Sequence, residues 1–268
     1  MRNVYIIPFE GICNRMRAIT SGVMVAKKIG SPAVIYWNKE KRCNCWFGDL
    51  FEPVAEDGVT VVENRSLINA IPKRGNLKLP LLLQKIKYSQ VVYLFNENTD
   101  GDIMSVIKSD ADDILLESSA SMGDHYPVNN LFTPLKQLRE KVDAISTTFD
   151  RPNVIGIHIR GTDNKISKRF STPDKFIARI DNEIGTNAAA RFFVATDEIA
   201  ARHELIRRYG KRIICCDDLP DRNSVEGLRG AIVELYCLSK TSRVIGSCGS
   251  TFSGTAAEIG GIPLEECR

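Results

Sequence analysis

The sequence predicts an α/β protein built from two Rossmann-type parallel-sheet halves, and three observations carry this prediction. Apolar stretches of strand length alternate with amphipathic stretches of helix length along most of the chain. This alternation begins near the N-terminus and starts again after a long helical segment that ends near residue 150. The 268 residues accommodate two modest hydrophobic cores, since one domain usually holds about 100 to 200 residues. We therefore expect one domain over residues 1–130 and a second over residues 131–268.

The first half opens with a strand, a helix and a second strand, over residues 4–8, 15–29 and 33–37. Such a unit implies parallel strands joined by a helix that covers the sheet. Further apolar runs predict strands over residues 59–62, 91–95 and 114–117. The first half therefore begins like a Rossmann-type domain.

The second half repeats the alternation after a helix expected over residues 134–149. Strands are predicted over residues 154–159, 191–196, 212–216 and 243–247. Helices are predicted over residues 174–184, 199–209, 224–239 and 253–259. This order is that of a second doubly wound sheet.

Composition narrows the class of protein. A net charge of +3 is too weak for a nucleic-acid binder, which usually carries a strong basic stripe, and it suits a small anionic ligand. The N-terminus lacks the apolar segment of a signal peptide, and no run of about 18 apolar residues occurs. We therefore expect a cytoplasmic protein with reduced cysteines. Cys43 and Cys45 have the spacing of metal ligands, but no second pair accompanies them, so a zinc site is disfavoured.

Polar residues follow three of the predicted strands in the second half. Arg160 follows the first strand, Asp197 and Glu198 follow the second, and Ser250 and Thr251 come after the last. The carboxyl ends of parallel strands share one edge of a sheet, where ligands collect. An arginine guanidinium can form bidentate hydrogen bonds with a diphosphate, and a helix N-terminus adds hydroxyl and backbone N–H donors. These residues therefore predict a phosphate-binding cradle.

Two further polar residues lie within predicted elements of this half. His158 belongs to the first strand, and Glu234 belongs to the helix over residues 224–239. Each has the chemistry to bind a base or a ribose, but side chains at such positions are more often satisfied structural groups.

Three motifs of the second half resemble those of one enzyme family. His158-Ile-Arg-Gly-Thr-Asp163 resembles the His-x-Arg-Arg-Thr-Asp motif of the α-1,6-fucosyltransferases and rhizobial nodulation fucosyltransferases. Val194-Ala-Thr-Asp-Glu198 is similar to their Ala-Thr-Asp-Asp segment. The stretch from Gly227 through Lys240 to Ser250 resembles their Leu-Arg-Gly, Asp, Leu-Ser and Ser-Ser stretch. The resemblance covers residues 130–268 well and the first half loosely, through Gly11-Ile-Cys-Asn-Arg-Met-Arg17.

The resemblance implies a GT-B fold with the active site in the cleft between two domains. It implies an inverting, metal-independent glycosyltransferase that moves fucose from GDP-fucose to a glycan or glycoconjugate acceptor, with no cofactor. Arg160 and Ser250 would bind the donor diphosphate, and His158 and Glu234 would face the guanine. Asp197 and Glu198 would lie beside the donor.

The remaining implied roles concern the first domain, the cradle and the proton acceptor. Asn14 and Arg15 stand in a loop like the one that opens the acceptor-side domain of related transferases, and Thr251 joins the substrate-binding set. The candidate bases are Asp163, Asp174 and Glu10, of which Asp163 is favoured because it stands near Arg160 in the motif and is assigned a catalytic role beside it.

Two departures from the family pattern limit what carries over. Gly161 replaces the second arginine of the motif, and Lys168 stands where the α-1,6 enzymes carry a glutamate. The donor site therefore carries over better than the acceptor site or the α-1,6 linkage.

Other interpretations of the sequence have weaker support. Asp100-Gly-Asp102 and Asp110-Ala-Asp112 match the Asp-x-Asp pattern of metal-dependent transferases, but such short patterns arise by chance. A nicotinamide dehydrogenase is disfavoured because no Gly-x-Gly-x-x-Gly follows the first strand. A sugar-nucleotide sensor that has lost its base, and a transferase that uses another nucleotide sugar, stay open as alternatives.

The segment over residues 77–87 mixes leucines with lysines, as helices on anionic membranes do. Peripheral contact with the inner face of a membrane is therefore one interpretation. The favoured interpretation is a helix that starts near Pro80 and turns its leucines to a core.

Overall fold

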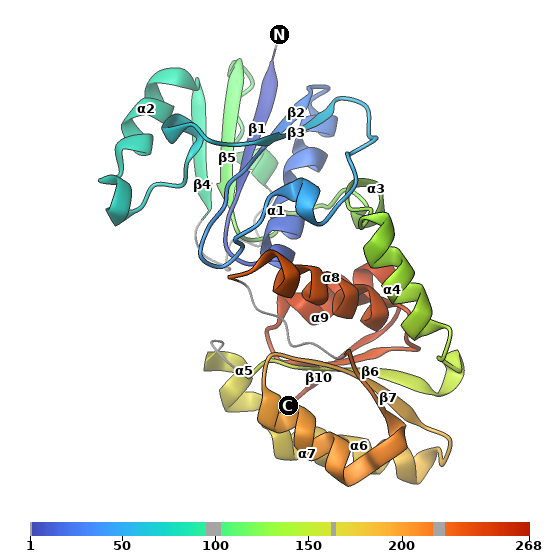
Figure 1. Ribbon diagram of the computed structural model, residues 1–268. Coiled ribbons are helices and arrows are strands. Elements are labelled where there is room, and N and C mark those ends of the chain that lie inside the picture. Colours follow the sequence, from blue (N-terminus) through green and yellow to red (C-terminus); the bar gives the residue numbers. More distant parts are fainter. Residues whose placement is uncertain (1, 95–102, 162–164, 217–222) are drawn as a thin grey trace. The chain divides into compact units, whose positions relative to one another are not determined.

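The computed structural model describes residues 2–94, 103–161, 165–216 and 223–268 (Figure 1). The chain divides into two compact units, residues 1–135 and 136–268. Each unit holds a five-stranded sheet in which the named strands pair in parallel. The predicted α/β class with two parallel sheets is thereby confirmed. None of the described helices combines the length and the apolarity that a membrane crossing requires.

The sheet of the first unit has the strand order β3-β2-β1-β5-β4. Its strands are β1 (Asn3–Pro8), β2 (Ala33–Trp37), β3 (Val59–Glu63), β4 (Gln90–Leu94) and β5 (Asp113–Ser118). Its α-helices are α1 (Ile12–Lys28), α2 (Leu79–Lys87) and α3 (Val128–Leu131). Short 3-10 turns include η2 (Leu67–Asn69) and η3 (Arg74–Asn76).

Helix α1 packs closely on β1 because it carries a glycine at the contact. A Cβ atom on Gly22 would lie 2.6 Å from Cδ1 of Ile6, so a larger residue would push the helix away from the sheet. The last turn of α1 contains Lys27 and Lys28, whose charges favour the negative end of the helix dipole. The position of α1 fixes the loop that precedes it.

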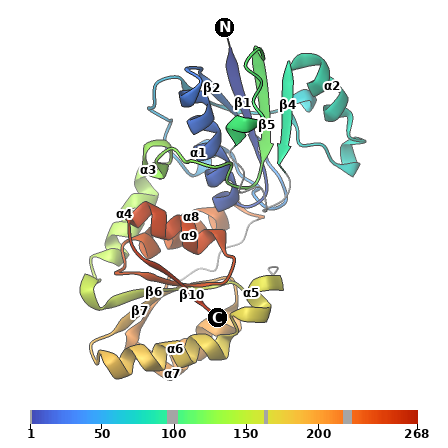
Figure 2. The same ribbon diagram turned by 180° about the vertical axis from the view of Figure 1, so that it is seen from behind.

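The sheet of the second unit has the strand order β10-β9-β6-β7-β8. Its strands are β6 (Val154–Ile159), β7 (Arg191–Thr196), β8 (Ile213–Ile214), β9 (Val244–Ser247) and β10 (Leu264–Cys267). Its helices are α4 (Lys136–Ser146), α5 (Lys165–Phe170), α6 (Pro173–Thr186), α7 (Ile199–Tyr209), α8 (Val225–Ser239) and α9 (Thr251–Gly260). Helices α6 and α7 cover one face of the sheet, and α8 and α9 cover the other (Figures 1 and 2). All six residues of β6 are buried, as expected of a central strand between two helical layers.

The strand order creates a switch point in each sheet. In the second unit the chain runs outward from β6 through β7 to β8, and it returns to the other side of β6 to form β9 and β10. In the first unit β1 and β5 are the corresponding neighbours. Helices leave neighbouring strands in opposite directions at a switch point, so the carboxyl ends there are the usual place for a ligand in an open α/β sheet.

A few elements differ from the expectation. The strand predicted over residues 212–216 is reduced to β8, because residues 210–212 form a 3-10 turn. The helix predicted over residues 134–149 spans only α4, since Pro134 instead pairs with Phe51 in an isolated bridge. The sequence does not predict α5 or β10, whose residues form no long apolar run.

Candidate functional site

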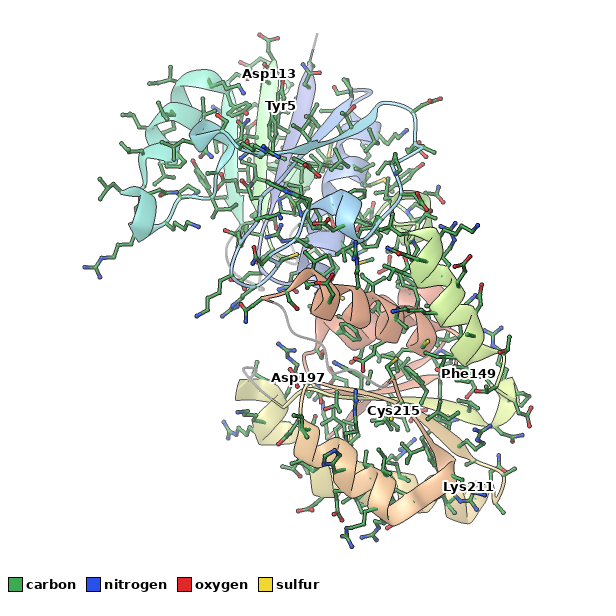
Figure 3. The ribbon with its side chains drawn as sticks, viewed as in Figure 1. Tyr5, Asp113, Phe149, Asp197, Lys211 and Cys215 are labelled. Carbon is green, nitrogen blue, oxygen red and sulfur yellow. The ribbon has the colours of Figure 1, made fainter. Side chains whose placement is uncertain are left out.

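Arg160 lies at the switch point of the second sheet, directly after β6. Its guanidinium Nη1 donates to Oδ2 of Asp197, which follows β7, over 2.6 Å. The other carboxylate oxygen of Asp197 accepts from the backbone N–H of Gly161 at 2.8 Å. Figure 3 shows Asp197 beyond the end of β7, at the edge of the sheet. One carboxylate therefore holds both the Arg160 side chain and the backbone that follows it.

Ser247, the last residue of β9, ties the neighbouring strand to the same point. Its hydroxyl accepts from the backbone N–H of Arg160 at 2.9 Å and donates to the carbonyl of His158 at 3.3 Å. The carboxyl ends of β6, β7 and β9 are thus joined around Arg160. The side chains of Arg160 and Asp197 are 17% and 15% exposed, so the charged pair still reaches solvent.

Gly161 stands where the family resemblance predicts a second arginine. A Cβ atom on Gly161 would lie 2.1 Å from Oε2 of Glu198 and 2.9 Å from its Cβ. The side chain of Glu198 therefore fills the space in which a side chain at position 161 would begin. A larger residue at position 161 would therefore require Glu198 to move.

His158 is buried in β6, at the same level as Ala195 of β7 and Gly246 of β9. Its Nδ1 lies 2.8 Å from Oγ of Ser253 and 3.4 Å from Oγ of Ser250. Burial, aided by the positive charge of Arg160, lowers the pKa of His158 to about 3. The imidazole is therefore neutral at physiological pH.

Helix α9 approaches His158 closely because Gly246 has no side chain. A Cβ atom at position 246 would lie 2.2 Å from Oγ and 2.4 Å from Cβ of Ser253. The ring of Phe252, from the first turn of α9, stacks on the His158 ring with centroids 4.8 Å apart. These contacts fix the N-terminus of α9 over the ends of β6 and β9.

Ser250 is the N-cap residue of α9, and Thr251 is its first helical residue. The preceding Gly249 has φ = +66°, a left-handed conformation that glycine adopts without strain, and its N–H donates to Glu266. The structure records no capping bond from the Ser250 side chain to this helix. The first N–H groups of a helix lack partners inside the helix and favour an anion. The structure thus brings Arg160, Ser250 and Thr251 to one switch point.

Glu234, on α8, is buried and faces Arg202 of α7 rather than solvent. Nη2 of Arg202 lies 3.2 Å from Oε1 of Glu234, and Nη1 donates to the carbonyl of Cys216 at 2.9 Å. Burial raises the pKa of Glu234. Its contact with a guanine stays a prediction.

Asn14 and Arg15 lie in the first turn of α1, not in a loop as the resemblance implies, and Arg15 is fully buried. Its Nε donates to the carbonyl of Glu10 at 2.9 Å, its Nη1 donates to the carbonyl of Asn38 at 2.6 Å, and its Nη2 lies 3.3 Å from Glu40. Arg15 therefore orders the loop between β1 and α1, and its contact with substrate stays a prediction. The neighbouring Asn14 has a buried Oδ1 with no hydrogen-bond partner among the described residues.

A buried carboxylate that the sequence does not single out lies at the switch point of the first sheet. Glu117, near the end of β5, is fully buried, and its Oε1 accepts from Nε2 of Gln84 at 2.7 Å. Its Oε2 has no hydrogen-bond partner in the described parts of the chain. Burial is the main cause that raises the pKa of Glu117 to about 8. The only sequence signal is a glutamate inside an apolar strand.

The candidate bases lie in three different places. Asp163 falls outside the described residues. Asp174 is exposed in the first turn of α6. Glu10, which has a strained φ of +68°, forms an ion pair with Arg42. Lys168, at the position of the family glutamate, is exposed on α5.

The structure also locates the residues considered for metal binding. Asp110 and Asp112 are exposed, and Asp100 and Asp102 lie outside the described residues. Among the described residues, no group of three or more His, Cys, Asp or Glu side chains is arranged to hold a metal ion. None of the eight cysteines forms a disulfide, and the Sγ atoms of the buried Cys43 and Cys45 lie 3.8 Å apart.

Comparisons with known proteins address the fold. No family model and no curated protein sequence matches the chain. NodZ alpha-1,6-fucosyltransferase soaked with GDP-fucose is similar over 96% of this chain and 92% of that chain, with a TM-score of 0.67 and 16% identity. A variant of Arabidopsis thaliana FUT1 in complex with GDP is similar over 98% of this chain and 70% of that chain, with a TM-score of 0.61 and 15% identity. POFUT1 in complex with GDP is similar over 99% of this chain and 98% of that chain, with a TM-score of 0.58 and 13% identity.

At sequence identities this low, the comparisons establish similarity of fold. Both parallel-sheet units are included, because the similarity spans nearly the whole chain. The resemblance predicted from motifs in the second half is thereby confirmed as a fold shared with fucosyltransferases of the GT-B type.

Proposed function

We propose that this protein is a glycosyltransferase that transfers fucose from GDP-fucose to a glycan or glycoconjugate acceptor. The observation that carries the proposal is that Arg160 and the N-terminus of α9 follow the neighbouring strands β6 and β9 at the carboxyl edge of one sheet, where Ser247 of β9 accepts from the backbone N–H of Arg160. This arrangement is complementary to a diphosphate, and it occurs in a fold shared with fucosyltransferases whose structures contain GDP or GDP-fucose.

The proposed roles in diphosphate binding rest on the positions of these residues and on the motif resemblance. Arg160 binds phosphate oxygens through the guanidinium, while Ser250 and Thr251 contribute hydroxyl groups and the N–H groups of the first turn of α9. Asp197 positions Arg160, since its carboxylate is bonded to both the guanidinium and the next peptide. Glu198 lies beside the donor. Preorganised donors of this kind stabilise charge without reorganising during the reaction.

We assign recognition of the guanine to His158 and Glu234. A neutral imidazole presents one N–H donor and one acceptor, which suits the edge of a base. The depressed pKa of His158 keeps the ring in that form. Glu234 is assigned this role because of its position on α8 in the matched motif. To bind a base, its carboxylate would have to give up the ion pair with Arg202.

The proposed reaction inverts the configuration of the fucose carbon. An acceptor hydroxyl attacks that carbon from the face opposite GDP, the bond to the β-phosphate oxygen breaks, and GDP leaves with the electron pair. A carboxylate takes the hydroxyl proton, and Asp163, Asp174 and Glu10 are the candidates. Arg160 and α9 offset the negative charge that develops on the departing diphosphate, so the reaction proceeds without a metal ion. The transition state resembles an oxocarbenium ion, as in glycoside hydrolysis.

The first unit, with Asn14 and Arg15 at the start of α1, is proposed as the acceptor-side domain. The second unit binds the nucleotide sugar.

Thermal shift with a panel of nucleotides tests the donor. A ligand that binds only the folded state stabilises it by RT ln(1 + [L]/Kd). GDP and GDP-fucose should raise the Tm more than UDP, UDP-sugars or NAD. Equal or larger shifts with UDP-sugars would instead support a transferase for another donor.

Release of GDP separates an enzyme from a sensor. An enzyme releases GDP from GDP-fucose when a panel of glycan acceptors is added, at a rate that depends on the acceptor. A non-catalytic sensor gives the same thermal shifts and releases no GDP with any acceptor.

A further inference from the structure

Helix α2 presents apolar side chains to solvent. Leu82 and Ile86 are 62% and 76% exposed, and Leu79 is 47% exposed. Residues three, four or seven positions apart lie on one side of a helix, so these side chains form a single stripe. The opposite side of α2 is buried through Pro80 and Gln84. The leucines at positions 79 and 82 therefore do not turn to a core, contrary to the interpretation favoured from the sequence.

Leu77 extends the stripe beyond the helix. It is 81% exposed, and both Leu77 and Lys78 have positive φ, at 52° and 55°. Side-chain-bearing residues rarely adopt this left-handed conformation, and two in succession are rarer still. The backbone is thus held in an uncommon form that leaves a leucine in water. We call Leu77, Leu79, Leu82 and Ile86, together with the cations beside them, the α2 surface.

The segment that carries the α2 surface contains basic residues and no acidic ones. Residues 64–96 contain six Lys or Arg residues and no Asp or Glu, whereas the whole chain has a net charge of +3. The rest of the chain is therefore net negative. Arg74, Lys78 and Lys85 are exposed beside the stripe, and no salt bridge joins them to a carboxylate within the described residues. Lys87 is also exposed, and its Nζ lies over the Tyr88 ring, 4.8 Å from the ring centre.

Helix α2 also occupies an outer position in its unit. It lies outside β4, which is an edge strand of the first sheet (Figures 1 and 2). The stripe can therefore meet a broad flat surface without first displacing other elements of that unit.

We propose that the α2 surface docks on an anionic phospholipid bilayer. Exposed leucine and isoleucine side chains enter the interface between headgroups and acyl chains, and the flanking cations contact lipid phosphates. A second copy of the chain fits less well. A symmetric dimer through this surface would set cations against cations with no carboxylate from residues 64–96 to offset them. The proposal concerns a surface outside the nucleotide site and holds whether or not the transferase assignment is correct.

Cosedimentation with vesicles tests the proposal on the full-length protein. One set of vesicles contains phosphatidylcholine alone, and the other contains phosphatidylcholine and phosphatidylglycerol at about three to one. Wild-type protein should bind the anionic vesicles, bind the neutral ones much less, and be released as the salt concentration rises.

Two double variants separate the apolar and the charged contributions. Lys78→Gln/Lys85→Gln should lower the partition coefficient on anionic vesicles about 25-fold, because each cation near such a surface contributes a factor of about five. Leu82→Ser/Ile86→Ser should lower it at least about tenfold by removing two interfacial side chains. Matched controls in the second unit are Lys211→Gln/Lys240→Gln and Ile206→Ser/Leu264→Ser, which alter exposed residues and should retain binding.

Three results overturn the proposal. The first is no binding of wild type to anionic vesicles. The second is equal binding of the α2 variants and their controls, with the Tm of each variant showing that it is folded. The third is light scattering that shows, without lipid, a dimer of wild type that Leu82→Ser/Ile86→Ser converts to a monomer.

Discussion

Asp197 binds Arg160 through one carboxylate oxygen, at 2.6 Å, and the N–H of Gly161 through the other, at 2.8 Å. The guanidinium proposed to bind the donor diphosphate is therefore held in place by the end of the neighbouring strand. The same contact gives Arg160 a structural task, and experiments have to separate the two roles.

Substitution of Arg160 should abolish most transfer while the protein stays folded. Loss of one preorganised donor to developing charge typically costs about 100- to 1,000-fold in turnover. Arg160→Lys keeps the positive charge but cannot bind a phosphate in the bidentate geometry of a guanidinium, so it should also strongly reduce the rate of fucose transfer. The measurements are Tm, GDP affinity and turnover for wild type, Arg160→Ala and Arg160→Lys.

The comparison with Asp197→Asn isolates the structural role. If Arg160 only ties two strand ends together, Arg160→Lys and Asp197→Asn should lower the Tm alike, and the folded fraction of each should still turn over. Near-normal GDP binding and turnover in well-folded Arg160→Ala would falsify the cradle.

Activity should survive removal of divalent cations. The proposed cradle assigns charge relief to Arg160 and to the N-terminus of α9, so excess EDTA should leave the initial rate of GDP release unchanged. The control is the same assay with added manganese. A rate that disappears in EDTA and returns with manganese contradicts the assignment and favours a metal-dependent transferase.

Titration of His158 should weaken the fold in mild acid. Its pKa is about 3 in the folded protein, against an ordinary value of 6.5. Between those pH values the unfolded chain binds a proton that the folded chain does not. The free energy of unfolding should therefore fall as the pH drops below 6.5, by up to about 1.4 kcal/mol per pH unit from this group.

Urea unfolding between pH 4 and pH 7 measures this slope. His158→Gln should have a shallower slope than wild type, because the titrating ring is gone. The control is His203→Gln, which removes an exposed histidine on α7 and should keep the wild-type slope. Parallel curves for wild type and folded His158→Gln are the contrary result.

Glu117 should produce the opposite trend in the first unit. Its pKa is raised to about 8 from an ordinary 4.5. Between these pH values the folded chain retains a proton that the unfolded chain loses. The contribution of Glu117 to stability is thus fully present below pH 4.5 and is lost as the pH rises through 8.

Replacement of Glu117 by glutamine tests this sign. Glu117→Gln has no carboxyl to ionise and keeps an oxygen for Gln84, so it should be more stable than wild type at pH 8 and flatter between pH 5 and pH 8. Glu63→Gln, at an exposed glutamate of β3, is the matched control and should follow wild type. A Glu117→Gln protein that loses stability with pH as steeply as wild type contradicts the buried, protonated carboxyl.

Much of the architecture follows from local patterns. Val154–Ile159, Arg191–Thr196 and Ile199–Tyr209 have the limits that the sequence predicts, since each is a strongly periodic or continuous apolar run. The placement of Arg160 and Asp197 after strands also follows, because a polar residue that ends such a run marks the edge of the sheet. Elements with a weak hydrophobic pattern are not predicted, because they form through pairing with a neighbouring strand. An example is β10, which contains two glutamates and pairs with β9.

The sequence by itself determined two parallel-sheet halves, the strand ends at which a ligand site is expected, and the motif resemblance to GDP-fucose-dependent enzymes. Only the tertiary structure decided the strand order, and with it which carboxyl ends become neighbours. It paired Arg160 with Asp197, turned Glu234 toward Arg202, buried Glu117 and left the α2 leucines in solvent. The physical reason is that periodicity reports which side of an element is apolar, whereas partners distant in sequence are chosen by packing, by the desolvation of charge and by close approaches such as that of Gly246 and Ser253.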